Sequence, residues 1–319
     1  RPSSAMWWKC PTTHSVLWII TLNWMSALIT PWKPAVSQPI GGIVLYVTAS
    51  NVTIDGITID GDQPLGNPGE DVNGVDVNAA HAVGNGTFDD VTKPFVDIDG
   101  LVVKNTIIVN FNDVAVLLYG SGASGTVSDF NVIECNRFDN MSGYNSLGFA
   151  RIATLLYNDT YAKVDTNVLT RVTVGVQTGN NYQAKDVGSV ASISSNQIEF
   201  DGVGIWHNLH YANASSWEIA LNQLASVGDK QADQPIGLFV SSIQGNVGVV
   251  VKNNNVTGSF DGVRLWNLPT TNTITVDGGT LVDNYLGVHV TNFDDVYGEA
   301  AASSCTHTLA KSRCSLCRL

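Results

Sequence analysis

Hydrophobic and polar residues alternate along this chain in short runs, and one combination of them returns many times. In Val251 to Trp266, Val251 is followed three positions later by Asn254, two later by Val256, and eight after the asparagine by Gly262-Val263. Between copies no segment sustains the 3.6-residue apolar period of a helix, and short runs rich in Val, Ile, Leu and Thr end at Gly, Asn or Asp. The pattern predicts short β-strands joined by tight turns.

The same frame fits eight stretches of the chain. The position of Asn254 in that frame falls, in chain order, at residues 57, 101, 136, 167, 196, 222, 254 and 279. Successive copies are therefore 44, 35, 31, 29, 26, 32 and 25 residues apart. A repeat of this length is typical of a solenoid, in which each copy forms one rung.

Asparagine occupies the shared position in five copies, namely Asn136, Asn167, Asn196, Asn222 and Asn254. If the rungs stack, these side chains form one column, and their amides can hydrogen-bond to each other and to turn carbonyls. Asparagine also tolerates the left-handed backbone that such a turn needs. We therefore interpret the asparagines as structural.

Stacking also explains how such short strands become stable. A strand of a few residues cannot bury its apolar face alone, whereas coiled strands bury one continuous core and pair their edges. The repeats resemble those of the pectate-lyase-like superfamily over roughly residues 43 to 296, and right-handed winding is what that resemblance implies. The predicted fold is all-β, a right-handed parallel β-helix of about eight rungs that occupies residues 41–299.

The two flanks do not follow the repeat. Residues 1–40 hold five of the eight tryptophans and no Asp or Glu, and their apolar run from residue 15 to 29 is too short for a convincing membrane span. Three interpretations stay open: a signal peptide, a cap on the first rung, or a non-native segment. Residues 300–319 are interpreted as a disordered or non-native tail, although Cys305, His307, Cys314 and Cys317 are residue types of a zinc site.

The formal net charge of −12 restricts the partners. Nucleic acid is disfavoured because its phosphates would be repelled, and no integral membrane span is expected. Polyanionic glycans are disfavoured as well, unless a cation such as calcium bridges the like charges. Apart from the zinc-type residues of the tail, calcium is the cofactor that the sequence suggests.

A cluster of acidic residues after the first copy could hold such a calcium ion. Its members are Asp60, Asp62, Glu70 and Asp71. Carboxylate oxygens are the ligands that calcium prefers, but the spacing does not match an EF-hand loop. The simpler interpretation, which we prefer, is that the Asp-Gly pairs make turns.

The strands that begin with the shared glycine predict a row of outward side chains. The residue after the glycine is apolar and points inward, so the next one points outward. In successive copies that residue is Asp76, Ala115, Gln177, Trp206, Phe239, Arg264 and His289, and Asn208 and Trp266 follow two positions further along. Rings beside amide and cationic groups suit sugars, so the predicted polysaccharide-binding residues are Trp206, Phe239, Trp266, Asn208 and Gln177.

Catalytic machinery is harder to find. Superfamily members that hydrolyse polygalacturonate carry N-T-D, D-D, G-H-G and R-I-K blocks, and this chain lacks them in that order. Arg264, His289 and His207 form the only cluster that resembles the site of a β-eliminating enzyme. The preferred hypothesis is therefore a secreted or cell-surface module of a larger protein that binds polysaccharide or acts as an adhesin. The alternative is a polysaccharide lyase or glycoside hydrolase that works on the Trp206–His289 face.

Overall fold

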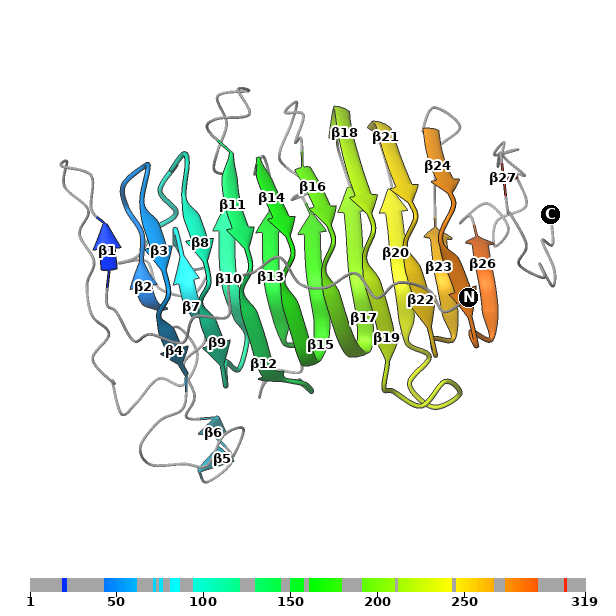
Figure 1. Cartoon of the computed structure of the whole chain (residues 1–319), viewed down its shortest axis with the longest axis horizontal. Coiled ribbons are helices and arrows are strands. Elements are labelled where there is room, and N and C mark those ends of the chain that lie inside the picture. The colour runs from blue at the N-terminus through cyan, green and yellow to red at the C-terminus, as the bar shows by residue number, and fades with distance from the viewer. Residues whose placement is uncertain are drawn as a thin grey trace, which may run out of the picture.

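Strands stacked side by side dominate the computed structural model (Figure 1). The structure describes residues 19–21, 43–61, 71–72, 75–76, 81–86, 94–120, 130–144, 150–157, 161–179, 191–209, 212–242, 245–266, 273–291 and 307–308. Within these ranges every regular element is a β-strand. No helix in the described part of the chain has the length and apolar character needed to cross a bilayer.

One large sheet contains ten strands. In spatial order they are β1 (Ile19–Thr21), β3 (Thr53–Asp55), β8 (Val102–Lys104), β11 (Asn131–Glu134), β14 (Ala162–Asp165), β16 (Ala191–Ser194), β18 (Ala212–Ala220), β21 (Gly245–Lys252), β24 (Thr273–Asp277) and β27 (His307–Thr308). Except for β1, which is antiparallel to β3, each strand runs parallel to its neighbours.

The second large sheet has fifteen strands arranged in two rows that share β15 (Val168–Gly179) and β17 (Gln197–Leu209). One row adds β4 (Thr58–Asp60), β9 (Ile107–Val109), β12 (Arg137–Met141), β19 (Gln223–Ser226), β22 (Asn255–Thr257) and β25 (Thr280–Val282). The other adds β2 (Ile43–Tyr46), β7 (His81–Gly84), β10 (Val114–Tyr119), β13 (Ile152–Tyr157), β20 (Ile236–Ser242), β23 (Asp261–Trp266) and β26 (Leu286–Thr291). Strands β5 (Asp71–Val72) and β6 (Val75–Asp76) form a separate antiparallel pair.

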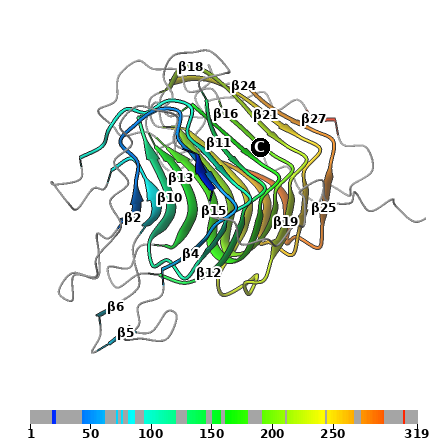
Figure 2. The ribbon, with the colours of Figure 1, turned by 60° about the vertical axis from the view of Figure 1, so that its left-hand side comes forward.

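Each rung passes through the ten-stranded sheet and then through the two rows of the larger sheet (Figure 2). The inward side chains stack in register, as in the column Ile54, Val103, Ile133, Val164, Ile193, Ile219, Val251 and Val276. These residues belong to one continuous apolar core that runs the length of the coil. The prediction of an all-β parallel β-helix of about eight rungs is therefore confirmed.

The second rung corrects the sequence frame. Ile54 pairs with Val103 rather than with Ile98, and Val103 pairs with Ile133. The shared position therefore falls on Thr106, whose backbone N–H donates to Asn136 Oδ1 at 3.0 Å, and not on Leu101. The first two intervals become 49 and 30 residues, so the extra residues belong to the first rung alone.

The five asparagines form the expected column, and all are buried. The Nδ2 of each of the first four donates to the Oδ1 of the next asparagine along the column, at 3.1 Å from Asn136, 3.0 Å from Asn167, 3.0 Å from Asn196 and 2.9 Å from Asn222. Each also donates to a carbonyl of the preceding rung, for example Asn196 to Val164 O at 3.0 Å. The column is thus a chain of amides that joins five consecutive rungs.

The left-handed residue of each turn is not the asparagine, contrary to the expectation from sequence. It is the residue before it, and the φ angles are 55° at Cys135, 55° at Thr166, 58° at Ser195, 60° at Leu221 and 53° at Asn253. This backbone turns the following asparagine inward, where its amide reaches both neighbouring rungs. The asparagine is therefore selected for its two-sided hydrogen bonding rather than for its backbone freedom.

The predicted flanks lie almost entirely outside the described residues. Ile19–Thr21 pairs with β3, and His307–Thr308 pairs with β24. The three interpretations of residues 1–40 and the interpretation of residues 300–319 as a tail stay predictions.

Replacing Asn196 by alanine tests the column. The change leaves Asn167 Nδ2 and Asn167 N–H without their acceptor and Val164 O without its donor, so we expect a loss of about 3 kcal/mol in the free energy of unfolding, at about 1–3 kcal/mol per orphaned group. Urea unfolding measures it, with the exposed neighbour Gln197→Ala as control. Equal midpoints for the two variants would show that the column is dispensable.

Candidate functional site

In the fifteen-stranded sheet, the row that contains β20, β23 and β26 carries a line of side chains on its outer face. These side chains neighbour each other on consecutive rungs. The register pairs Gln177 with Trp206, Trp206 with Phe239, Phe239 with Arg264, and Arg264 with His289. A parallel line two positions further along contains Asn208, Ser241, Trp266 and Thr291. We call the residues from Trp206 to His289 on these two lines the aromatic face.

Glycines fix the bend at which this face begins. A Cβ added at Gly204 would lie 2.6 Å from the carbonyl oxygen of Gly237, and one added at Gly237 would lie 2.6 Å from that of Gly262. The backbones of successive rungs approach closely here, and any side chain would push them apart. The shared glycine of the sequence frame therefore marks the place where each rung turns onto the aromatic face.

The first two members of the predicted outward row are wrong. Ala115 is fully buried in the core, because β10 places both Ala115 and Val116 inward where the rung bends. The row continues instead from Gln177 to Leu155 and then to Leu117. Asp76 lies in β6, which pairs only with β5.

Three rings of the aromatic face pack against one another. The ring centroids of Trp206 and Phe239 are 5.5 Å apart with the planes at 19°, and those of Phe239 and Trp266 are 6.2 Å apart at 46°. The Trp206 indole N–H donates to Ser241 Oγ at 3.4 Å, and Ser241 Oγ donates to Asn208 Oδ1 at 3.0 Å. These contacts hold the half-buried rings in fixed orientations.

A buried carboxylate, which the sequence analysis did not single out, holds the two basic residues of this face. Asp261 Oδ2 accepts a hydrogen bond from Arg264 Nε and lies 3.1 Å from His289 Nδ1. The Asp261 side chain is fully buried, and its Oδ1 has no hydrogen-bond partner among the described residues. Arg264 Cζ also lies 6.0 Å from the centre of the Phe239 ring. The charge of Arg264 is therefore matched locally by a carboxylate.

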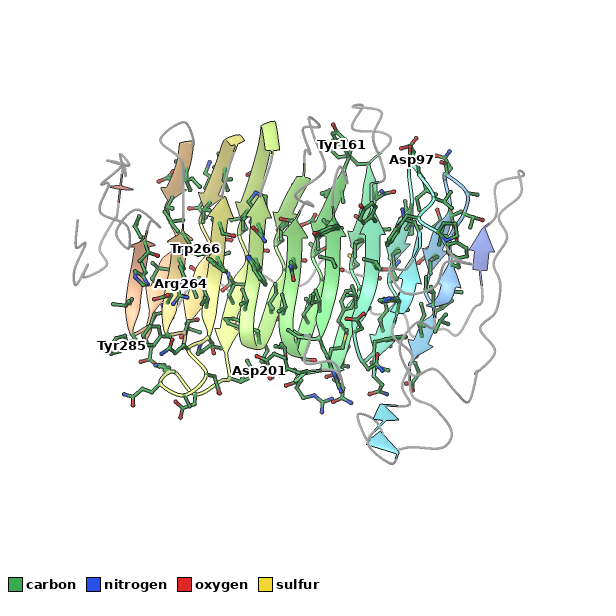
Figure 3. All side chains as sticks on the ribbon, turned by 180° about the vertical axis from the view of Figure 1, so that it is seen from behind. Asp97, Tyr161, Asp201, Arg264, Trp266 and Tyr285 are labelled. Atoms are coloured by element: carbon green, nitrogen blue, oxygen red, sulfur yellow. The ribbon has the colours of Figure 1, made fainter. Side chains whose placement is uncertain are left out.

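Arg264 and Trp266 lie on the same strand near one end of the coil (Figure 3). Both follow the Asp261-Gly262 pair, which in sequence is typical of a turn. The only sequence signal for Asp261 is its place three residues before an outward arginine. That signal has meaning only once the bend at Gly262 is known.

His207 is separated from the other two residues of the predicted catalytic cluster. It lies next to Trp206 on β17, so it faces the other side, in register with the core residue Val240. The ring is fully buried, and its Nδ1 lies 2.5 Å from Thr178 Oγ1. Burial lowers the pKa of His207 to about 3. Arg264 and His289 remain together, without His207.

The predicted calcium cage is described only in part. Asp60 Oδ1 accepts from Asn110 Nδ2 at 2.7 Å, and Asp71 belongs to β5. Asp62 and Glu70 lie outside the described residues, so the cage stays a prediction. Within the described ranges no group of three or more His, Cys, Asp or Glu side chains could hold a metal ion.

A hollow of about 360 Å³ lies on the other outer face of the same sheet, over β15, β17, β19, β22 and β25. Its floor includes the row Gln197, Gln223, Asn255 and Thr280, in which Asn255 Nδ2 donates to Gln223 Oε1 at 3.1 Å and Thr280 Oγ1 donates to Asn255 Oδ1 at 2.6 Å. None of the described side chains that line it is aromatic. The two outer faces of the sheet thus differ in chemistry, one with amides and one with rings.

Comparisons with known proteins give no relative from which a function could be transferred. The chain matches no protein-family model, no curated protein and no solved structure.

A double-mutant cycle tests the Asp261–Arg264 pair. Arg264→Ala leaves a buried carboxylate whose one remaining partner among the described residues is His289, so we expect a loss of about 3 kcal/mol in the free energy of unfolding. Asp261→Asn combined with Arg264→Ala should lose less than the sum of the two single changes, by about 1–3 kcal/mol. Additive losses in urea unfolding would mean that the two side chains do not interact.

His207 predicts a pH dependence of stability. Because its folded pKa is lowered from 6.5 to about 3, the folded ring stays neutral in this window while the unfolded chain takes up a proton. The free energy of unfolding should therefore fall as the pH falls from 6.5 toward 3, by up to about 1.4 kcal/mol per pH unit, and this contribution is fully present above pH 6.5. Unfolding of the wild type and of His207→Gln across this range measures the difference. Parallel curves would contradict the assignment.

Proposed function

We propose that this chain is a polysaccharide-binding β-helix module, and that the glycan lies on the aromatic face. The observation that carries the proposal is the packing of Trp206, Phe239 and Trp266 on neighbouring rungs of one outer face. Aromatic rings cover the apolar faces of sugars, and fixed polar groups beside them bind the hydroxyl groups. Such groups on this face come from Gln177, which neighbours Trp206 on the next strand, from Asn208, which follows Trp206 on the same strand, and from His289, which neighbours Arg264.

Charge favours a neutral glycan. The chain carries a formal net charge of −12, and the charge of Arg264 is already matched by Asp261. A uronate polymer would meet repulsion over the whole molecule and no uncompensated arginine on the aromatic face. A calcium ion bound elsewhere could offset the repulsion, which is why calcium is varied in the experiment below.

The setting belongs to the same proposal. We infer an extracellular or cell-surface location, membership of the pectate-lyase-like superfamily, and a role as a module of a larger surface protein that binds glycan or acts as an adhesin. Support comes from the parallel coil, from its many short rungs, and from the ring-lined face. A stacked coil also presents a long, rigid surface of the kind on which repeat proteins bind extended partners.

One observation favours an enzyme as the second candidate. Arg264 and His289 lie on neighbouring strands, and Asp261 contacts both, so the imidazole is oriented with one nitrogen toward the carboxylate. An oriented histidine beside an arginine could remove a proton from a uronic acid. Binding remains the preferred function because β-elimination also requires a free positive charge to neutralise the uronate, and Asp261 already compensates Arg264.

The test of binding is the double variant Trp206→Ala/Trp266→Ala. Loss of the two rings should weaken affinity for a retained glycan by about 1–3 kcal/mol, because both stacking and apolar burial disappear. The full chain is screened against neutral and uronate polysaccharides with and without calcium, and affinities are measured by calorimetry. Tyr285→Ala is the matched control, since this ring is 62% exposed, stacks on Phe260 and lies at a turn away from Trp266 (Figure 3).

The same screen separates the two candidates. Retention of a glycan without new ultraviolet absorbance or new reducing ends supports a binding module. Absorbance from unsaturated sugars would identify a lyase, and new reducing ends alone would identify a hydrolase. Unchanged affinity of the double variant for every retained glycan would remove the aromatic face from the proposal.

A further inference from the structure

The sheet surface that includes the aromatic face continues toward the first rungs, where it carries a second group of rings. The register pairs Tyr119 with Tyr157 and Tyr157 with Gly179. Thr178 pairs with His207, so the residues that come next on the two strands, Gly179 and Asn208, are neighbours as well. Asn208 in turn pairs with Ser241, and Ser241 pairs with Trp266. Tyrosines at one end and a tryptophan at the other therefore belong to one line of neighbouring positions.

The second group is packed in the same way as the first. The ring centroids of Phe95 and Tyr119 are 4.2 Å apart with the planes at 18°, and those of Tyr119 and Tyr157 are 5.6 Å apart at 35°. All three rings are partly buried. Phe95 and Tyr157 pack against a small apolar cluster of Val114, Leu117 and Leu155, and Tyr119 packs against both of these rings.

Gly179 lies between the two groups of rings. A Cβ at this position would be 3.1 Å from Cε2 of the Tyr157 ring and 3.5 Å from the carbonyl oxygen of Asn208. The Tyr157 ring therefore extends toward the next rung, over the place that a side chain at Gly179 would occupy. Among the described residues of this face, Gln177, Gly179 and Asn208 lie between the groups, and they are polar or have no side chain.

We propose that the two groups of rings form one continuous track for a long, extended polysaccharide chain that crosses the rungs along the coil. This inference rests on the proposed function and defines its ligand further. The line from Tyr119 to Trp266 crosses five strand spacings, or about 24 Å at ~4.8 Å each. A short oligosaccharide fills only the aromatic face, whereas a longer chain passes Gly179 and reaches Tyr157 and Tyr119.

The experiment measures affinity against chain length, with size-fractionated oligosaccharides of a glycan that the wild type retains. Wild-type affinity should rise with length until the chain covers both groups of rings. Tyr157→Ala should weaken the longest oligosaccharides about two- to tenfold and leave the shortest bound one unchanged. The Trp206→Ala/Trp266→Ala double variant should weaken short and long chains alike.

Two controls separate binding from packing. Tyr157→Phe keeps the ring and should keep wild-type affinity for long chains. Tyr144→Ala removes a ring that is 65% exposed and not part of the line, and should have no effect on affinity. Unchanged affinity for the shortest oligosaccharide shows that the Tyr157→Ala protein is folded.

The possible failures are distinct. If Tyr157→Ala binds oligosaccharides of every length as tightly as the wild type does, the rings of Phe95, Tyr119 and Tyr157 serve packing alone, and the track is overturned while the proposed function stands. If Tyr157→Ala weakens short and long oligosaccharides equally, the effect is structural and the track is again overturned. If the wild type retains no glycan at all, the proposed function itself fails, and the track fails with it.

Discussion

The buried asparagine column is the interaction on which the rest of this structure depends. Each amide satisfies a backbone N–H, a carbonyl and the next amide, so a rung cannot slip by one residue without leaving several buried groups unpaired. Apolar packing already opposes a slip of one residue, which would turn the inward face outward, but it tolerates a slip of two residues more easily, since Val, Ile and Leu are interchangeable in a column. The column therefore fixes the register, and the register decides which side chains become neighbours on the outer faces, including Trp206 and Phe239.

The sequence predicted the coil because its strongest signal, an asparagine at a constant offset from apolar residues, corresponds to that column. The frame was assigned incorrectly at the second rung because residues 98–103 also fit its spacing. The true frame, Val103 to Ile108, has threonine at the shared position. The prediction failed at Ala115 because alternation of inward and outward residues holds only along a regular strand. At the bend β10 turns two consecutive residues inward, and strict alternation cannot represent this.

The chemistry of the candidate site was less accessible to sequence reasoning than the fold. Arg264 and His289 could be aligned because both follow the shared glycine by the same offset, yet their common partner Asp261 precedes the glycine and resembles a turn residue. The prediction that placed His207 in the same cluster was wrong for a different reason. Its closeness to Trp206 in sequence suggested a shared site, but neighbouring residues on a strand face opposite sides. Which charges are compensated, and by what, follows from the bend and not from any local motif.

Ring packing along a solenoid has two consequences that have to be separated before a function is assigned. Side chains in register on parallel strands stabilise the sheet when they stack, so Trp206 and Phe239 would favour the coil even if nothing were bound. Stacking for stability alone, however, does not require hydrogen-bonding groups beside the rings. On this face Asn208, Ser241 and His289 accompany the rings, whereas the described residues that line the hollow on the other face include amides and no rings. The combination of oriented rings with adjacent polar groups, rather than the rings themselves, is what supports the proposal that this face binds sugars.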